Sequence, residues 1–302
     1  MSHRRPLLGC VGSGRLAMTL LPAWAKAGWK ISTVAGRNPD TVQRLARRVG
    51  AQPRLDLVGL ADGTGILLLA VPDESIRSIA SRLAEENDWS GRVVLHHAGA
   101  FGPELLAPLS DAGASTGLLH PLQVMPKRGG KELPRGTRAR CEGAPAALKA
   151  ARRLARDAGL VALPAKLKWT PTRRTDYHVA ATLAANDLAA LVASGSRLLE
   201  SSGLSRRAAL DALIPLAQGA LEQLSSETPG QAVSGPIPRG DAATLATHFD
   251  RLERRDRDLQ EIHRLLSSRV LKLATEEGRI PESARKRLRK LIAAGRTGGS
   301  TV

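Results

Sequence analysis

The pattern of apolar and polar positions divides the 302-residue chain into two parts. In the first, short apolar runs alternate with segments of helical period. Residues 65–71 are apolar almost throughout, which is typical of a strand buried on both faces of a parallel sheet. From Thr172 onward the pattern is that of long helices rich in alanine and leucine. The sequence therefore predicts a doubly wound α/β sheet, Rossmann-like, over residues 1–165, and an all-helical domain over residues 166–302.

The expected strands cover residues 6–9, 29–35, 65–71, 92–95, 115–119, 137–141 and 160–163. Between them, helical period is found at residues 41–49, 103–112 and 146–158. In the second part, the expected helices cover residues 175–201, 206–224, 242–251, 256–273 and 283–293. Residues 229–240 form an irregular connection rich in glycine and proline.

A glycine-rich segment joins the first expected strand to the first helical segment. Gly12 would allow a tight turn, Gly14 would let the backbone approach a pyrophosphate, and Ala17 would keep the helix close to the strand. The phosphates would lie on free N–H groups of the helix that begins near Arg15. The alternative is a glycine turn without a ligand, but the strand and helix that follow favour nucleotide binding. The dinucleotide-binding residues expected here are Gly12, Ser13, Gly14, Arg15, Leu16 and Ala17.

The end of the second expected strand bears on which dinucleotide binds. Enzymes for NAD usually place Asp or Glu there, whereas this chain has Gly36 and Arg37. The Arg37 guanidinium could pair with a 2′-phosphate, which predicts NADP(H) as the cofactor. Asn38, followed by Pro39, is typical of a helix N-cap, and we count it with the cofactor-binding residues. The alternative for Arg37 is a solvated arginine at a loop edge.

The formal net charge of +17 raises the question of nucleic acid as a partner. Most basic residues near the C-terminus are interleaved with acidic ones. A compact basic segment occurs at residues 285–291, where leucines at helical spacing indicate a terminal helix with a solvated basic face. Binding of nucleic acid or of an acidic partner there is the less favoured alternative, and residues 295–302 are expected to be a frayed basic tail.

Cysteine usage and hydropathy favour a cytoplasmic location. Cys10 and Cys141 have neither metal-ligand spacing nor the number needed for a disulfide framework, so no metal site is expected. The apolar run before Cys10 is too short for a signal peptide. We identify no apolar stretch that approaches the roughly 20 residues of a membrane span, and expect no membrane association.

Six segments, within a match that runs from about residue 6 to 265, resemble a known family. They are A-V-P-D at 70–73, H-H-A-G-A at 96–100, G-L-L-H-P-L-Q at 117–123, Y-H-V-A-A at 177–181, A-N at 185–186, and G-P-I-P-R-G-D at 235–241, followed by Thr244 and His248. Together they are similar to the motifs of Rossmann-like proteins with a DUF2520 C-terminal domain. The wider superfamily contains pyrroline-5-carboxylate reductase, 6-phosphogluconate dehydrogenase and F420-linked NADP oxidoreductases.

This resemblance implies an NADP-linked oxidoreductase, a homodimer formed through the helical domain, and a link to ketopantoate-like 2-oxo acids. It leaves F420 open as a further cofactor. The chain departs from its relatives at Ala98, where they usually carry serine. Related dehydrogenases often place a proton-donating lysine four residues before a helix asparagine, but this chain has Thr182 there and no lysine between Trp169 and Leu271.

Several polar side chains follow expected strands. Because ligands of open α/β sheets bind at the carboxyl ends of the strands, we expect Val71, Pro72 and His96 to line the cofactor. His120 precedes Pro121, so its backbone should be extended and its imidazole could enter the cleft as a proton donor. For His96 and His120 alike, a structural hydrogen bond is the alternative.

The helical domain contributes a second group of candidates. His178, Thr182 and Asn186 are spaced by four residues and are expected to form one stripe on a helix, for substrate contact or for structural hydrogen bonding. Asp241 has the chemistry of a helix N-cap, and Arg239 could clamp a substrate carboxylate. The predicted catalytic residues are thus His120, His178, Asn186, Arg239 and Asp241.

These features favour an NADPH-dependent reductase of a small 2-oxo acid or a cyclic imine, acting in the cleft between the two domains. The absent lysine motivates an alternative, a protein that senses a dinucleotide or binds a partner without turnover. The charge alone motivates a third, less favoured interpretation, nucleic-acid binding through the basic C-terminus.

Overall fold

The computed structural model describes residues 5–86, 88–126, 132–164 and 166–294. The expected tail at residues 295–302 lies outside the described residues. Close contacts divide the chain into two units, Met1–Ala185 and Asn186–Val302, and each is described by itself.

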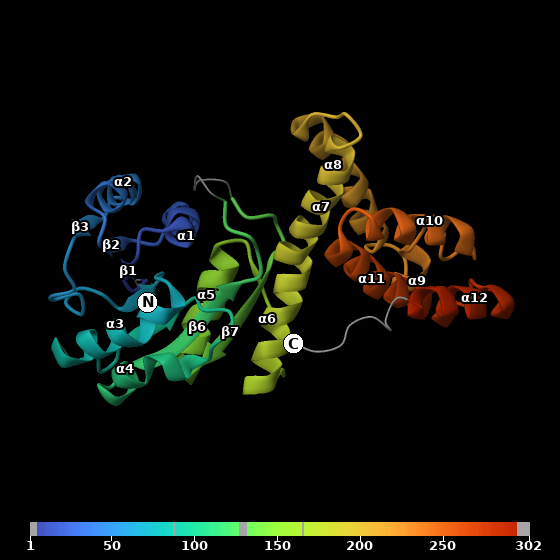
Figure 1. The fold of residues 1–302 in the computed structure, drawn as a ribbon. Helices are drawn as coiled ribbons and strands as arrows, with labels where there is room; N and C mark the ends of the chain where they lie inside the picture. Colours follow the sequence, from blue (N-terminus) through green and yellow to red (C-terminus); the bar gives the residue numbers. More distant parts are fainter. Residues whose placement is uncertain (1–4, 87, 127–131, 165, 295–302) are drawn as a thin grey trace. The chain divides into compact units, whose positions relative to one another are not determined.

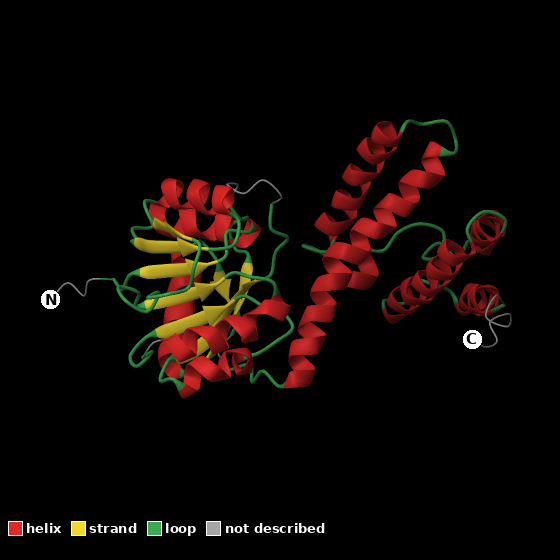
Figure 2. Ribbon diagram, turned by 60° about the vertical axis from the view of Figure 1, so that its left-hand side comes forward, coloured by secondary structure: helices red, strands yellow, loops and turns green. Residues whose placement is uncertain are grey.

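The first unit contains an eight-stranded sheet in the order β3-β2-β1-β4-β5-β6-β7-β8 (Figure 2). Neighbouring strands are parallel except for β6 and β7, which are antiparallel. The mostly parallel sheet of the prediction is therefore confirmed. The strands are β1 (Leu8–Val11), β2 (Ile31–Ala35), β3 (Gln52–Arg54), β4 (Ile66–Leu69), β5 (Val93–His96), β6 (Ser115–Pro121), β7 (Arg138–Gly143) and β8 (Val161–Ala162).

Helices cover both faces of the sheet, which explains why its central strands are apolar on both sides. On one face, α1 (Arg15–Lys26), α2 (Pro39–Val49) and α5 (Pro145–Asp157) contribute to one buried apolar cluster. On the other, α3 (Asp73–Glu86), the 3-10 turn η1 (Pro103–Leu106) and α4 (Ala107–Asp111) contribute to a second. The buried indole of Trp24 ties α1 to α5 by donating to the Leu154 carbonyl at 2.8 Å.

Two elements of this unit were not predicted. Strand β3 is a short edge strand, partly exposed and containing Pro53, so it lacks the apolar alternation by which strands are recognised. Helix α3 begins at Asp73, directly after Pro72, and buries Ile76, Ala80 and Leu83 at helical spacing. This apolar spacing is present in the sequence, but the sequence analysis assigns no element to residues 73–86.

A helical region follows the sheet, as predicted. It begins with α6 (Pro171–Thr182), still in the first unit, and continues through a π-helical segment, η2 (Leu183–Asp187), into α7 (Leu188–Glu200). The remaining helices are α8 (Arg206–Gln223), α9 (Pro229–Ala232), α10 (Ala242–Glu253), α11 (Arg257–Glu276) and α12 (Glu282–Ala293). The short helix α9 lies inside the segment expected to be irregular.

The core of the second unit is built from α10, α11 and α12. Phe249, Leu271 and Leu288 are buried in one apolar cluster with the inner residues of these helices. In α12, Ala284, Leu288 and Ile292 are buried while most of the basic residues between them are exposed. This is the amphipathic terminal helix that the leucine spacing predicted.

The helix pair α7–α8 differs from this core because it buries little (Figure 1). Among the described residues, only Ser196 of α7 and Ala209 of α8 are fully buried. The continuous helix Pro171–Glu200 is also long and apolar enough to span a membrane, with a window of mean hydropathy 1.3 that is 6% buried. By length and composition, this helix corrects the expectation that no such stretch occurs.

Candidate functional site

The glycine-rich loop lies between β1 and α1. Gly12 has φ +115°. A Cβ atom there would lie 2.1 Å from the carbonyl oxygen of Ala70, the residue that directly follows β4. Any side chain at this position would therefore force the loop away from the sheet. Gly14, the N-cap of α1, is exposed, and a Cβ atom on it would meet nothing within 4 Å. The loop is thus packed tightly against the sheet at Gly12 and has free space beside it at Gly14.

The other residues predicted to bind the cofactor surround this loop. Ala17 is buried and Leu16 packs partly on the core, so both position the start of α1. The Ser13 hydroxyl lies 2.7 Å from the Thr41 hydroxyl of α2. Arg15 is exposed at the first turn of α1, where, in the described structure, no side chain caps the helix and no acidic residue occurs. The free backbone N–H groups of this first turn are therefore available to an anion.

Arg37 and Asn38 follow β2 and have different surroundings. The Asn38 side chain accepts a hydrogen bond from the Thr41 backbone N–H at 3.0 Å and so caps α2, as its sequence context predicted. Arg37 is exposed, and within the described residues it forms no ion pair. Its guanidinium is therefore free at the strand end where the ribose of a dinucleotide would lie.

His96 ends β5 and is fully buried. Its Nδ1 accepts from the Ala98 backbone N–H at 3.1 Å, so its Nε2 carries the proton and donates to the Gly102 carbonyl at 2.9 Å. Burial lowers the pKa of His96 to about 4. Both ring nitrogens are thus used to shape the loop after β5, which favours the structural role. Val71 and Pro72 follow β4 at the same edge of the sheet.

His120 in β6 contacts α6 through Tyr177. Its Nδ1 lies 2.9 Å from the Tyr177 hydroxyl, and the two rings meet edge to face at 5.6 Å. On its other side the ring lies against Gly99, where a Cβ atom would come within 2.7 Å of Nε2. Burial, reinforced by the charge of Arg140, lowers the pKa of His120 to about 3. The imidazole is therefore neutral at neutral pH, unlike the near-neutral acid expected from the sequence.

Arg140 of β7 occupies the centre of this cluster and is fully buried. Its guanidinium carbon lies 5.2 Å from the ring centroid of Trp169 and 5.4 Å from that of Tyr177, in cation–π contact. Its Nη2 donates to the carbonyls of Ala98 and Phe101. Within the described structure, Nε and Nη1 have no hydrogen-bond partner. Leaving buried donors without a hydrogen bond is costly, so this arginine calls for an explanation beyond packing.

Tyr177 and its neighbour Arg174 attach α6 to the sheet. Arg174 pairs with Glu142 of β7 and with Glu104 of η1, the latter at 3.1 Å. Glu142 also lies 3.8 Å from Nη1 of Arg140. Two arginines thus face two carboxylates, so the cluster is close to neutral. Burial raises the pKa of the Tyr177 hydroxyl to about 12, against the opposing effect of the Arg140 charge.

Sequence reasoning missed Arg140, Trp169 and Arg174 as members of this site. Arg140 carried a signal, because a charged residue between Ala139 and Cys141 interrupts an otherwise buried strand. Arg174 carried none, since its partners are 32 and 70 residues away in the chain. Tyr177 stood within a quoted motif, but no role had been assigned to it.

The expected stripe of His178, Thr182 and Asn186 runs from α6 into the π-helical segment. His178 is exposed on α6. The Thr182 hydroxyl donates to the His178 carbonyl at 3.0 Å. The π-helical segment then begins at Leu183, and its wider turn still leaves side chains four residues apart close to one face. Asn186 belongs to the second unit.

Arg239 and Asp241 also lie in the second unit. Asp241 caps α10: its carboxylate accepts from the Thr244 backbone N–H at 3.0 Å and from the Thr244 hydroxyl at 2.6 Å. These hydrogen bonds lower its pKa and occupy both carboxylate oxygens. Arg239 is exposed in the turn before the helix. The capping interpretation therefore accounts for Asp241 without a catalytic role.

Models of two known domain families match the chain, one in its first part and one in its second. Residues 1–121 match the model of a Rossmann-like domain, and residues 138–270 match that of a domain of unknown function, DUF2520. The chain combines a Rossmann-like domain with a DUF2520 domain. The DUF2520 match begins at β7, so Arg140, Arg174 and Tyr177 belong to it while His120 belongs to the Rossmann-like match.

Solved structures share this architecture at low sequence identity. A protein of Bacteroides fragilis, described provisionally as an NADP oxidoreductase, is 19% identical with a TM-score of 0.70, covering 88% of this chain and 98% of its own. A pyrroline-5-carboxylate reductase of Coxiella burnetii is 14% identical with a TM-score of 0.57, covering 95% and 99%. A reductive aminase of Aspergillus terreus, in complex with NADPH and ethyl levulinate, is 16% identical with a TM-score of 0.61, covering 95% and 99%.

At these identities the likeness shows the fold and its distant similarity to NAD(P)-dependent reductases. Among curated proteins, none matches this sequence.

Proposed function

We propose that this Rossmann-like/DUF2520 protein is an NADPH-dependent reductase of a small 2-oxo acid or a cyclic imine, acting at the carboxyl edge of its sheet. The observation that carries the proposal is the contact of 2.9 Å between Tyr177 and His120 beside the buried Arg140. This cluster lies at the ends of β5 and β6, and the open glycine-rich loop follows β1 at the same edge. In open α/β sheets, this edge is where ligands bind.

The residues around the loop fit a phosphorylated dinucleotide. The open side of Gly14 and the uncapped N-terminus of α1 would take the pyrophosphate. Arg37, with no carboxylate at the strand end to accept from a ribose hydroxyl, would take the 2′-phosphate. The reductive aminase that shares the fold was solved with NADPH. Bound NADPH would supply a hydride to the substrate carbon.

Reduction of a carbonyl or imine leaves negative charge on oxygen or nitrogen, so the site must supply a proton. Neutral His120 has no imidazolium proton to give at neutral pH, and no lysine occurs at the helix position where related dehydrogenases carry one. The Tyr177 hydroxyl stays protonated because its pKa is raised to about 12. On proton release, the Arg140 guanidinium over the ring would stabilise the tyrosinate, and His120 would hold the hydroxyl in place.

The test compares wild type with Tyr177→Phe, which keeps the ring contacts and removes only the hydroxyl. With a panel of 2-oxo acids and cyclic imines, we expect wild type to oxidise NADPH and the variant to lose roughly two to four orders of magnitude in kcat. The affinity for NADPH should stay unchanged. Tight NADPH binding without turnover of any substrate by wild type would instead favour the dinucleotide-sensing alternative.

We propose further that the protein is a cytoplasmic homodimer formed through its helical part. Ile214, Leu221 and Leu224 are exposed and follow one another at spacings of seven and three residues, so they lie on one face of α8 and its C-cap. A face of this kind on a soluble protein marks an interaction surface. The polar pair Asn186 and Asp187 interrupts the apolar stretch of the long helix, which favours a second copy over a lipid bilayer as its partner.

A further inference from the structure

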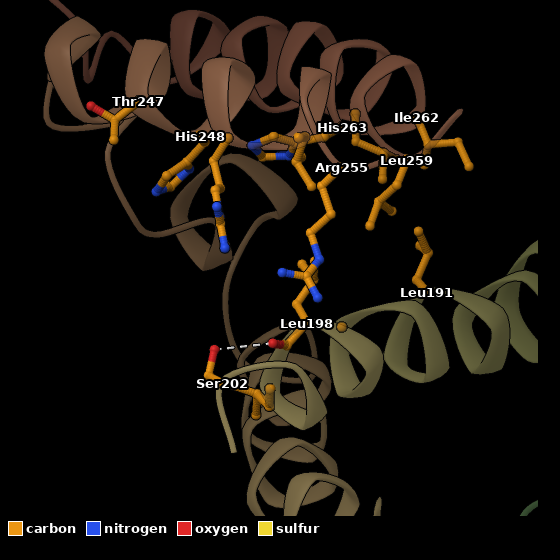
Figure 3. Close-up of a pocket in the computed structure, with 14 residues that line it drawn as sticks. Leu191, Leu198, Ser202, Thr247, His248, Arg255, Leu259, Ile262 and His263 are labelled. Carbon is orange, nitrogen blue, oxygen red and sulfur yellow. Dashed lines mark hydrogen bonds between the residues drawn. The ribbon is translucent and has the colours of Figure 1, made fainter. Parts of the chain in front are cut away.

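A cavity of about 550 Å³ lies within the second unit, between α7 on one side and α10 and α11 on the other (Figure 3). Two stripes of apolar side chains at helical spacing form most of its walls. Leu191, Leu198 and Leu199 come from α7, and Leu259, Ile262 and Leu266 come from α11. Its size is within the range of about 300–1,000 Å³ that is usual for small-molecule sites. Most of the wall is apolar, so the body of a fitting ligand must be apolar too.

Apart from the hydroxyls of Ser202 and Thr247, the polar side chains of the cavity are cationic or imidazole groups. His248, Arg251 and Arg255 line it from α10 and the turn that follows, and His263 lines it from α11. The rings of His248 and His263 lie 5.6 Å apart. In Figure 3, the Arg255 side chain extends from the α10–α11 side toward α7, across the space between the helices.

No carboxylate among the described residues offsets these charges at the cavity. The lining contains neither Asp nor Glu, and Arg251 and Arg255 form no ion pair within the described structure. The nearby Asp256 is occupied as the N-cap of α11, where it accepts from the Leu259 backbone N–H at 2.9 Å. Both guanidinium groups are exposed and are therefore available to an anion that enters the cavity.

We propose that this cavity binds a small organic anion with an apolar body, such as a carboxylic acid with an alkyl or aryl chain. The carboxylate would pair with Arg255 and Arg251, with His248 and His263 beside it, and the chain would lie among the leucines of α7 and α11. The cavity lies wholly within the second unit, whereas the Tyr177 cluster belongs to the first. The proposal is therefore independent of the reductase activity and of NADPH.

The probe is octanoate, titrated by calorimetry into the full-length protein without nucleotide. We expect saturable binding, and binding of octylamine that is at least about tenfold weaker, because the same chain then carries the opposite charge. Arg255→Gln should weaken octanoate about tenfold or more. The matched control is Arg254→Gln, which removes a neighbouring exposed arginine that does not line the cavity and should bind octanoate like wild type.

A second variant tests the apolar wall of the cavity. Ile262 is 42% exposed, so Ile262→Trp should fold while its indole fills the space, and octanoate binding should be lost. Three outcomes would overturn the proposal: no saturable binding of octanoate, equal affinity for octylamine, or octanoate binding unchanged in both variants. Loss of self-association in Arg255→Gln without any probe would also overturn it, because the cavity would then be an interface between two copies. None of these readouts depends on NADPH oxidation.

Discussion

Gly12 and Gly14 lie two residues apart and meet opposite surroundings. At Gly12 the Ala70 carbonyl occupies the space of a Cβ atom, whereas at Gly14 the same space is empty. The sequence motif predicted both positions, because each glycine in such a loop has a known purpose. Arg140 at the centre of the cluster was not predicted, because a charge within a strand marks an unusual position but does not show which carbonyls, rings and carboxylates will surround it.

Arg37→Ala tests the choice of dinucleotide. Removing the guanidinium should cost about 1–3 kcal/mol of NADPH binding, the value of a hydrogen bond to a charged group, and leave NADH binding unchanged. A side-by-side titration of both nucleotides measures this. Arg48→Ala, an exposed arginine at the far end of α2, is the matched control. An equal loss for NADPH and NADH would show that Arg37 does not contact the 2′-phosphate.

Stability should fall in mild acid because three histidines are buried in the neutral form. Burial lowers the pKa of His96 and His97 to about 4 and that of His120 to about 3. As the pH falls below about 6.5, the unfolded chain takes up protons that the folded chain does not, and each histidine costs up to about 1.4 kcal/mol per pH unit. This loss continues until the pH reaches the folded pKa values.

Thermal unfolding between pH 8 and pH 5 checks this expectation, with melting temperatures that decline below about pH 6.5. His96→Asn should lower stability at pH 8 but flatten the decline. His178→Asn, a change at an exposed histidine, should leave the pH dependence of the melting temperature as in wild type. A melting temperature independent of pH in wild type would contradict the buried neutral state of these rings.

At the scale of elements, the predictable parts are those with a strong period of their own. The buried strands β4 and β5 and the amphipathic helices α5 and α12 follow from their sequence patterns. Strand β3 does not, because a three-residue edge strand is defined by its pairing with β2. The π-helical segment has no sequence signal either, because Leu183–Asp187 has the composition of an ordinary α-helix.

The contacts that attach α6 to the sheet likewise could not be predicted from the sequence. It rests on Arg174, which joins Glu142 and Glu104, and on Tyr177, which meets His120. Of the predicted catalytic residues, His120 alone lies in this cluster, while Asp241 is a helix cap. The sequence therefore indicated one residue of this cluster, His120, but not the residues that attach α6 to the sheet.

At the scale of the whole molecule, the exposed apolar face of α8 decides between a monomer and a dimer. Sedimentation velocity without detergent should give twice the chain mass. Leu221→Glu should weaken the dimer roughly a hundredfold, because each of two copies loses about 1.5 kcal/mol or more of apolar burial. Gln223→Glu adds the same charge two residues away, on the opposite face of the helix, and should leave the mass unchanged. A monomeric wild type would refute this assembly.

The single π turn also sets the direction in which the side chains of α7, the next part of the same helix, point. A π segment amounts to one residue inserted into an α-helix, and each residue in an α-helix advances the side chains by about 100°. Deleting one residue between Leu183 and Asp187 would turn every side chain of α7 by that angle relative to α6. Natural relatives that lack this extra residue would therefore present a different face of α7 to the same surroundings. Insertions and deletions here deserve more weight in sequence alignments than substitutions do.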